Sequence, residues 1–268
     1  MTASGSRLDV ELTRRGLARS RTDAATLIAG GSVLVNGRTA QKAAQKVLGS
    51  DRLELAETGP RYASRAGHKL AGALEVFSVV GTEGKRCLDA GASTGGFTDV
   101  LLRSGAASVV AVDVGHDQLV PRLRDDPRVQ VHEGLNIRDI TPDLVGGPVD
   151  VVVSDLSFIS LRLVMEPLAG MCRPGADLVL MVKPQFEVGR TALPKGGVVR
   201  EAAQRRTAVV GVVDSAVQAG LEPHGLARSP LPGQDGNVEF FLWLRSPMRP
   251  TPAADAEDWV DRQTVNWA

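Results

Sequence analysis

From residue 86 onward, short apolar runs alternate with segments of helical length, and this alternation constrains the fold more than any other feature of the chain. Apolar runs without a polar face are typical of strands that helices cover on both sides of a parallel sheet. The predicted strands lie near 86–89, 108–113, 128–132, 149–154, 177–182, 224–229 and 237–244. The predicted helices between them lie near 96–104, 116–124, 160–171 and 200–219. The sequence therefore predicts an α/β fold with a seven-stranded, mostly parallel sheet, closed by an antiparallel edge hairpin.

The first predicted strand of this region ends in a glycine-rich loop, RCLDAGASTGGFTD, between Arg86 and Asp99. A strand that leads through glycines into a helix brings backbone N–H groups close to a ligand. The pattern G-x-x-x-G-G lacks the central glycine that a pyrophosphate requires in the dinucleotide fingerprint. S-adenosylmethionine, a nucleotide-type cofactor without pyrophosphate, fits this loop. The loop residues predicted to bind it are Asp89, Gly91, Ser93, Gly95, Gly96 and Phe97.

Four predicted strands end in a charged residue, namely Asp89, Asp113, Asp155 and Lys183. The carboxyl ends of parallel strands meet at one edge of a sheet, where the ligand crevice of an open α/β fold lies. We therefore expect these four side chains to converge on one pocket. Asp113 is placed to accept hydrogen bonds from ribose hydroxyls, and Asp155 is expected to serve both the cofactor and the reaction.

Two further residues are candidates for the adenine end of such a cofactor. Asn136 in VHEGLN offers an amide to the adenine edge, although it also fits a plain turn. Phe158 in SDLSFIS offers a ring to stack on adenine, although a lone aromatic beside an apolar run is more often part of the core. Both alternatives stay open at the level of the sequence.

Charge is distributed unevenly along a chain of 268 residues whose formal net charge is zero. Residues 1–70 carry a net charge of +6, so the remainder carries −6. The basic end is the predicted face for a polyanion, and a merely solvated arginine-rich surface is the alternative. Cys87 and Cys172 lie far apart beside apolar runs, which predicts buried free thiols and a reducing, cytoplasmic setting. No apolar stretch approaches the roughly 18 residues that a membrane span requires.

The basic end has the pattern of a small helix–helix–hairpin module. A helix is predicted over 7–15, and a second one follows an N-cap at Ser20. A strand over 33–35 leads into the turn signal Asn36-Gly37, and another strand is predicted over 52–55. This module resembles the S-four RNA-binding domain. The resemblance, together with the start of the next helix, implies an RNA face formed by Arg7, Arg15, Arg19, Arg21, Lys42 and Arg65.

Two charged residues lie at positions that would otherwise be apolar. Lys69 belongs to a helix that Ser64 caps and that is predicted to run to about Val80. Glu239 lies inside the apolar strand NVEFFLWLR, where an unpaired carboxylate carries a desolvation penalty, so we expect Lys69 or Lys183 to pair with it. A buried ion pair without a catalytic role is the alternative interpretation.

The order Lys69, Asp155, Lys183, Glu239 resembles the Lys-Asp-Lys-Glu tetrad of FtsJ-like ribose 2′-O-methyltransferases. With the S-four module, the chain from about 7 to 245 resembles the TlyA family, sometimes labelled haemolysin. The resemblance implies a Rossmann-like methyltransferase sheet, S-adenosylmethionine as cofactor, and methylation of cytidine 2′-hydroxyls in small- and large-subunit ribosomal RNA. It also implies the division into an RNA-binding domain over 1–60, a linker over 61–64, a methyltransferase domain over 65–246 and a C-terminal tail over 247–268.

Other functions have less support from the residues. A non-catalytic RNA-binding or ribosome-assembly protein would keep the same fold with a vestigial pocket, and the family label raises a membrane-lytic role that no amphipathic or lipid-anchoring segment supports. Scattered histidines and the lack of a cysteine pair with ligand spacing predict no metal site. The tail from Pro247 is expected to be loosely held apart from a short helix near Trp259, and a monomer is the default expectation.

Overall fold

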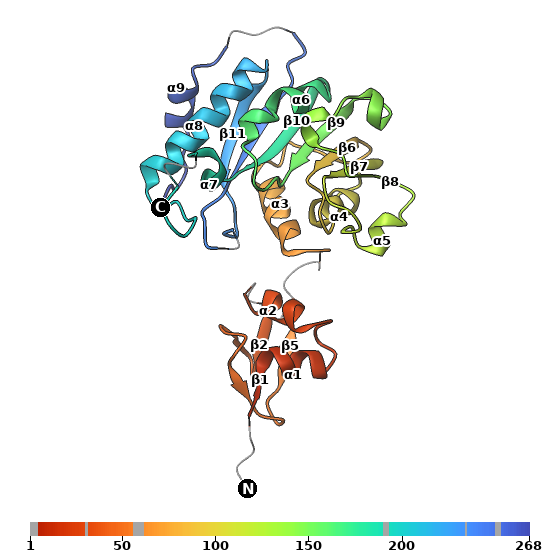
Figure 1. The fold of residues 1–268 in the computed structure, drawn as a ribbon, viewed down its shortest axis with the longest axis vertical. Helices are drawn as coiled ribbons and strands as arrows, with labels where there is room; N and C mark the ends of the chain where they lie inside the picture. Colours follow the sequence, from red (N-terminus) through yellow and green to blue (C-terminus); the bar gives the residue numbers. More distant parts are fainter. Residues whose placement is uncertain (1–4, 30–31, 56–61, 190–192, 234, 250–252) are drawn as a thin grey trace. The chain divides into compact units, whose positions relative to one another are not determined.

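The computed structural model describes residues 5–29, 32–55, 62–189, 193–233, 235–249 and 253–268. The chain divides into two compact units, Met1–Arg61 and Tyr62–Ala268, whose ribbons are drawn in Figure 1. Each unit is described by itself. Residues 56–61, which include the first residue of the linker predicted over 61–64, lie outside the described residues.

The first unit packs two helices against short antiparallel strands around its own apolar core. Strand β2 pairs with β3 and with β5, and β1 pairs with β4. Asn36 and Gly37 both have positive φ in the predicted turn between β2 and β3. The strands β1 and β4 are too short to show a period, and the sequence did not predict them. The elements are β1 (Ser6–Arg7), α1 (Leu8–Arg14), α2 (Arg21–Ala29), β2 (Val33–Val35), β3 (Arg38–Thr39), β4 (Lys46–Val47) and β5 (Leu53–Leu55).

The second unit contains the predicted seven-stranded sheet. Its strand order is β11-β12-β10-β9-β6-β7-β8, and only β12 runs antiparallel to its neighbours on both sides. The strands are β6 (Arg86–Ala90), β7 (Ser108–Asp113), β8 (Val129–Glu133), β9 (Val149–Ser154), β10 (Cys172–Val182), β11 (Glu222–Arg228) and β12 (Phe240–Arg245). Apart from β10, which begins five residues earlier than expected, the predicted strands agree with these bounds to within three residues.

Helices cover both faces of this sheet, as predicted (Figure 1). Neighbouring residues of one strand face opposite sides, so Cys87 packs with the helices of one face and Leu88 with those of the other. One face is covered by α3 (Arg65–Val76), α4 (Gly96–Arg103) and α5 (Pro121–Arg124). The other is covered by α6 (Met165–Gly170), α8 (Ala202–Gln218) and α9 (Ala256–Asp261). The remaining short elements are α7 (Pro184–Glu187) and the 3₁₀ turns Ile137–Asp139, Asp143–Val145 and Leu161–Leu163.

Three predicted helices are shorter than the sequence suggested. The helix predicted over 116–124 exists only as α5, because Asp117 has positive φ and Pro121 can only start a helix. Residues 160–171 form a 3₁₀ turn followed by α6 instead of one helix. The helix capped by Ser64 ends at Val76, with Phe77 as its C-cap, and does not reach Val80.

The expectation of a loosely held tail is wrong for residues 253–268. Helix α9 lies at the predicted position, and Val260 is buried in the core of the second unit. The Arg205 guanidinium, itself buried on α8, donates to the carbonyl of Trp267 at 2.6 Å, and the Trp267 ring lies 5.0 Å from that of Phe240. A composition rich in proline and alanine gave no sign of these two long-range contacts.

The two cysteines are free thiols. Cys87 is buried as predicted, whereas Cys172 is partly exposed, because it is the first residue of β10. Burial raises the pKa of each thiol to about 12, so neither has the character of a reactive thiolate.

Candidate active site

The charged strand ends meet at one edge of the sheet. Asp113 is the last residue of β7, Asp155 follows β9, and Lys183 follows β10, and these strands run parallel. Asp89 lies one residue before the end of β6, between β7 and β9. Glu239 directly precedes β12 rather than lying inside it, and because β12 is antiparallel its start falls at this same edge.

The four tetrad residues form two ion pairs. Lys183 Nζ lies 2.6 Å from Asp155 Oδ1. Lys69 Nζ donates to Glu239 Oε2 at 2.6 Å, and both side chains are buried. Lys69, from α3, is therefore the cationic partner that the sequence required for Glu239. Gly233 lies against the same carboxylate, since a Cβ there would come within 2.7 Å of Glu239 Oε1.

Asp89 is a fully buried carboxyl group below the glycine loop. The Thr98 hydroxyl donates to its Oδ2 at 2.6 Å, but its Oδ1 has no hydrogen-bond partner among the described residues. Burial raises the pKa of Asp89 to about 7, and the charges of Asp155 and Asp113 act in the same direction, against the hydrogen bonds from Thr98. Such a carboxyl group fits a site that a cationic or hydrogen-donating ligand completes.

The conformation of the loop after β6 is fixed by close contacts with Asp155 and Asp113. Gly91 has a φ of +89°, and a Cβ there would meet the Asp155 carbonyl oxygen at 3.0 Å, so only glycine fits without strain. The Asp113 carboxylate accepts from the N–H of Ser93 at 2.8 Å and from that of Gly115 at 2.7 Å. Ser93 itself has positive φ, and Gly95 is the N-cap of α4. Asp113 thus fixes the loop and keeps lone pairs for further donors.

The structure gives three predicted cofactor residues a packing or capping task. Gly96 faces α3, where a Cβ would come within 2.2 Å of Ser64 Oγ. The Phe97 side chain is buried in the core, and its ring lies 6.1 Å from the Phe241 ring. Asn136 Oδ1 accepts from the N–H of Arg138, which is the turn-forming role that the sequence left open.

Phe158 is not a core residue. Its side chain is 92% exposed, and its φ of +64° is unusual for a bulky residue. The Phe158 ring lies 5.3 Å from that of Phe186, and the Lys183 amine lies 5.9 Å from the Phe186 centroid. Through Phe186, Phe158 therefore lies near the Lys183 end of the site.

Two residues of this edge were missed by the sequence analysis. Val114, next to Asp113, is 69% exposed, and an exposed apolar side chain at a strand end suits the face of an adenine ring. Ser157 accepts a hydrogen bond from Lys183 Nζ at 2.8 Å. The only signal for Ser157 was its place two residues after Asp155, and a serine at that spacing is too common to single out.

Unsatisfied polar atoms also gather at this edge. Among the described residues, seven buried side-chain polar atoms lack a hydrogen-bond partner. Three belong to the strand ends, at Asp89, Ser154 and Asp155, although the Asp155 oxygen lies in the ion pair with Lys183, and a fourth belongs to Gln185 on α7. Buried polar atoms are normally satisfied, so such a group indicates a ligand site. The chemistry of the donor set, with carboxylates at Asp89 and Asp113 and a glycine-lined loop between them, fits a nucleoside carrying an amino acid group.

The residues predicted to contact RNA differ in how many hydrogen bonds and ion pairs they already form within the protein. Arg15 donates to Glu11 and to the carbonyls of Leu48, Gly49 and Asp51, so it serves the first unit itself. Arg7 and Arg21 both pair with Asp9 and remain largely exposed.

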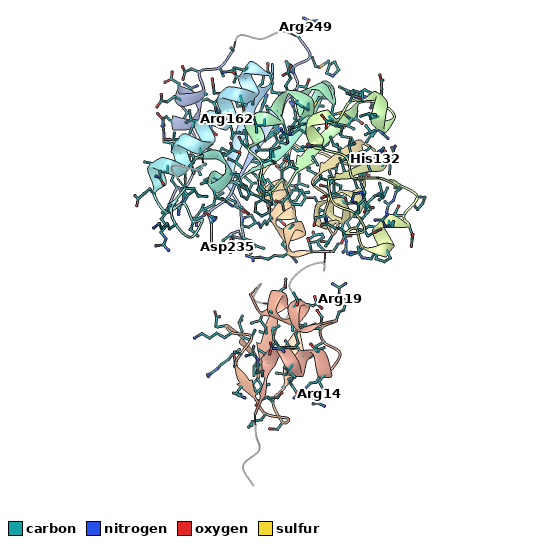
Figure 2. All side chains as sticks on the ribbon, viewed as in Figure 1. Arg14, Arg19, His132, Arg162, Asp235 and Arg249 are labelled. Atoms are coloured by element: carbon teal, nitrogen blue, oxygen red, sulfur yellow. The ribbon has the colours of Figure 1, made fainter. Side chains whose placement is uncertain are left out.

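Arg19 and Lys42 are also exposed members of that set. The Arg19 side chain is 79% exposed and extends away from the ribbon (Figure 2), and Lys42 is exposed as well. In the second unit, Arg65 donates to the Pro232 carbonyl at 3.0 Å. Tyr62 to Ser64 are anchored beside it, since the N–H of Ala63 donates to Asp99 at 2.8 Å.

No described helix is long and apolar enough to cross a membrane. Within the described part of the chain, no group of three or more potential ligand side chains is arranged to hold a metal ion.

The sheet order with one antiparallel strand, the glycine loop after β6 and the charged strand ends together define a Rossmann-like methyltransferase. Comparison with known proteins identifies the family. The model of the FtsJ-like methyltransferase family matches residues 62–246, and that of the S4 domain matches residues 6–53. The chain belongs to the TlyA family of FtsJ-like methyltransferases.

Three relatives illustrate the similarity over the whole chain. The 16S/23S rRNA (cytidine-2′-O)-methyltransferase TlyA of Mycobacterium tuberculosis is 51% identical, over 97% of both chains. The Bacillus subtilis protein YqxC, provisionally named an rRNA methyltransferase, is 41% identical over 92% of this chain and 88% of its own. A solved structure from Streptococcus thermophilus, provisionally named a hemolysin, has 38% identity and a TM-score of 0.73, covering 97% of this chain and 96% of its own.

Proposed function

We propose that this protein transfers a methyl group from S-adenosylmethionine to the 2′-hydroxyl of cytidines in small- and large-subunit ribosomal RNA. The single observation that carries the proposal is the pair of ion pairs, Lys183–Asp155 and Lys69–Glu239, at the carboxyl edge of a methyltransferase sheet. The Mycobacterium tuberculosis relative, whose name states this reaction on 16S and 23S rRNA, supports the choice of substrate. With such a substrate, the enzyme would act in the cytoplasm.

The cofactor would lie along the loop after β6. Asp113 and the exposed Val114 would contact its ribose and adenine, and Asp89 would face the amino acid end or fix the loop. When bound, S-adenosylmethionine supplies a methyl group on a positively charged sulfur, which is already a good electrophile. The protein therefore has to improve the other reactant, the ribose oxygen, which is a poor nucleophile at neutral pH.

Lys183 is the residue proposed to act on that oxygen. Its amine lies at the strand edge beside Asp155, and it would hold the 2′-hydroxyl and either accept its proton or stabilise the negative charge that develops on oxygen. Glu239 would hold Lys69, so that a second cation lies on the same edge. Alignment of the oxygen with the methyl group supplies much of the remaining acceleration.

Phe158 suits the RNA better than the adenine of the cofactor. Its exposed ring lies beside Phe186, which is in contact with the Lys183 amine, so a base stacked there would have its ribose close to that amine. Stacking on an aromatic ring is a common way for a protein to hold an unpaired RNA base. We therefore assign Phe158 to the target nucleotide.

The experiment that tests the proposed function is methyl transfer by the purified full chain, with labelled S-adenosylmethionine and isolated 30S or 50S subunits or their free RNA. Nuclease mapping should locate the label on the 2′-oxygen of cytidines. Isothermal titration with S-adenosylmethionine separates this from a non-catalytic RNA-binding protein, whose vestigial pocket should give no binding heat. Failure to label any rRNA, with cofactor binding intact, would contradict the proposed substrate.

A further inference from the structure

The Lys183 amine is held by a second residue besides Asp155. Its Nζ donates a hydrogen bond to Ser157 Oγ at 2.8 Å. Asp155 Oδ1 is closer, at 2.6 Å, but no hydrogen bond of acceptable geometry reaches that oxygen from the described residues. Asp155 therefore contributes mainly through its charge, whereas Ser157 provides a hydrogen bond of defined direction.

We propose that Ser157 is a positioning residue for Lys183, and that Glu187 holds Ser157 in place; the proposal rests on the methyltransferase function given above. In its protonated form, which stabilises negative charge on oxygen rather than accepting a proton, the lysine side chain bears three N–H donors on a freely rotating bond. A hydrogen bond to Ser157 fixes that rotation, and the attraction of Asp155 orients a second N–H. One N–H remains for the ribose oxygen.

The loop that carries Ser157 is attached at both ends. At its start, the N–H of Asp155 donates to the Ala90 carbonyl at 3.2 Å. At its end, the Ser160 hydroxyl donates to Glu187 Oε2 at 2.5 Å, and the N–H of Leu161 donates to Glu187 Oε1 at 2.8 Å. Both carboxylate oxygens of Glu187 thus bind the same loop.

Lys183 and Glu187 belong to one short segment. Lys183 is the N-cap of α7, and Glu187 is the last residue of that helix. The segment therefore contacts the loop twice, through Lys183 to Ser157 and through Glu187 to Ser160. A shift of the loop relative to the lysine would break both contacts, so the geometry of the amine is linked to that of the loop.

Two further observations show that the contacts between Glu187 and the Ser157 loop are kept despite unfavourable burial and backbone strain. Burial raises the pKa of Glu187 against the opposing effect of the Ser160 hydroxyl, the Leu161 N–H and the Arg162 charge. Phe158, between Ser157 and Ser160, has a left-handed backbone, which is strained for a bulky side chain. Strain of this kind persists only where surrounding contacts hold the chain, which the bonds to Glu187 do.

The test measures single-turnover methyl transfer by the full chain at saturating cofactor and rRNA. Ser157→Ala should lower the rate about tenfold to hundredfold, the range for a hydrogen bond to a charged group, and leave the affinities for S-adenosylmethionine and RNA unchanged. Ser157→Thr keeps the hydroxyl and should recover most of the rate. Glu187→Gln, which cannot accept both hydrogen bonds, should lower the rate about threefold to tenfold, the range for a neutral hydrogen bond.

A double variant separates positioning from general damage. If Ser157 acts through Lys183, then Ser157→Ala should cause no further loss in a Lys183→Ala background. Ser215→Ala is the matched control, because that serine donates to the Val212 carbonyl on α8 and should keep the wild-type rate.

Three outcomes would overturn the proposal. They are a wild-type rate for Ser157→Ala, a full additional loss in the Lys183→Ala background, and loss of cofactor affinity in parallel with the rate. An inactive wild-type chain would instead count against the proposed function, so the two failures are distinguishable.

Discussion

Two buried carboxyl groups of the first unit, Asp9 and Glu11, have surroundings opposite to those of Asp89 in the second unit, which elsewhere also pairs buried carboxylates such as Glu239 with cations. In the first unit, Asp9 receives hydrogen bonds from Arg7 and Arg21, and Glu11 receives them from Arg14 and Arg15. In the second unit, Asp89 is buried more completely, and the hydrogen bonds that reach it from the described residues come from the hydroxyl and the backbone N–H of the neutral Thr98.

The pKa values follow this difference. The hydrogen bond from Arg7 lowers the pKa of Asp9 far below its usual range, and that from Arg14 lowers the pKa of Glu11 to about 2. Burial raises that of Asp89 to about 7. A carboxylate that its own unit neutralises stabilises the fold, whereas one left without a cation marks a place where a ligand completes the structure. Four predictions test this contrast, from the largest expected effect to the smallest.

Replacement of Lys183 should affect chemistry and leave binding intact. Lys183→Ala is expected to lower the methyl transfer rate about a thousandfold, because the proposed acid–base or electrostatic contribution is lost. The affinity for S-adenosylmethionine, measured by titration calorimetry, should stay within a factor of about two of wild type, since an interaction made only in the transition state does not alter ground-state binding. A variant that methylates rRNA at the wild-type rate would remove Lys183 from the mechanism.

Replacement of Asp89 should affect the cofactor and its pH dependence. Asp89→Asn is expected to weaken S-adenosylmethionine binding about tenfold to hundredfold, the range for a hydrogen bond to a charged group. Because the Asp89 pKa of about 7 exceeds its ordinary value, the group is protonated in the free protein below neutral pH. Binding to the charged form must then release a proton, so wild-type affinity should fall as the pH drops through about 7.

The control for this pH effect is the Asp89→Asn variant itself, since an asparagine amide does not titrate. The quantity to compare is the slope of log affinity for S-adenosylmethionine against pH. The difference in this slope between wild type and variant isolates the contribution of the Asp89 carboxyl group from that of the cofactor's own amine. Identical slopes would show that Asp89 fixes the loop without meeting the ligand.

Acid should weaken the first unit. Glu11 and Asp9 have folded pKa values below their ordinary values of 4.5 and 3.8, so their contribution to stability is complete above about 4.5 and is lost as the pH falls toward 2. Residues 1–61 contain no aromatic residue, and all three tryptophans lie in the second unit. As the pH falls from 4.5 toward 2, hydrogen exchange in the first unit should therefore increase, while tryptophan fluorescence reports on the second unit separately. Hydrogen exchange in the first unit that stays constant over this range would contradict the prediction.

Replacement of one accessible arginine in the first unit should give the smallest effect. Arg19→Ala is expected to weaken rRNA binding a few-fold and to reduce the slope of log affinity against log salt by about one. Arg249→Ala, an exposed arginine of the second unit outside the predicted RNA face, is the control for the change in net charge (Figure 2). An unchanged salt slope for Arg19→Ala would exclude this residue from the RNA face.

The sequence predicted the sheet well because its strands are buried on both sides. Val109, Val110 and Val151 belong to apolar runs bounded by polar turns, so few other structures suit them. Local signals also located the turn at Asn36-Gly37 and the cap at Ser64. Contacts between distant segments carried no such signal, and the docking of Trp267 on Phe240 is an example.

The sequence predicted most residues of the candidate site but not which of them pair with each other. The spacing of Asp155 and Lys183 at strand ends determined their edge of the sheet, yet the choice between Lys69 and Lys183 as the partner of Glu239 required coordinates. A hydroxyl such as Ser157 has no desolvation penalty large enough to make its position unusual. The exposure of Phe158 depends on a left-handed backbone that its neighbours in sequence do not encode.

The bond between Lys69 and Glu239 spans 170 residues, and this separation has a consequence for biosynthesis. While the chain is being made, the helix with Lys69 leaves the ribosome long before the strand that completes its ion pair. The nascent protein can form its first unit and the early strands of the sheet, but the proposed methyl-transfer site is complete only after β12 has inserted between β10 and β11. A newly made molecule therefore becomes active late, after nearly all of its second unit has been translated.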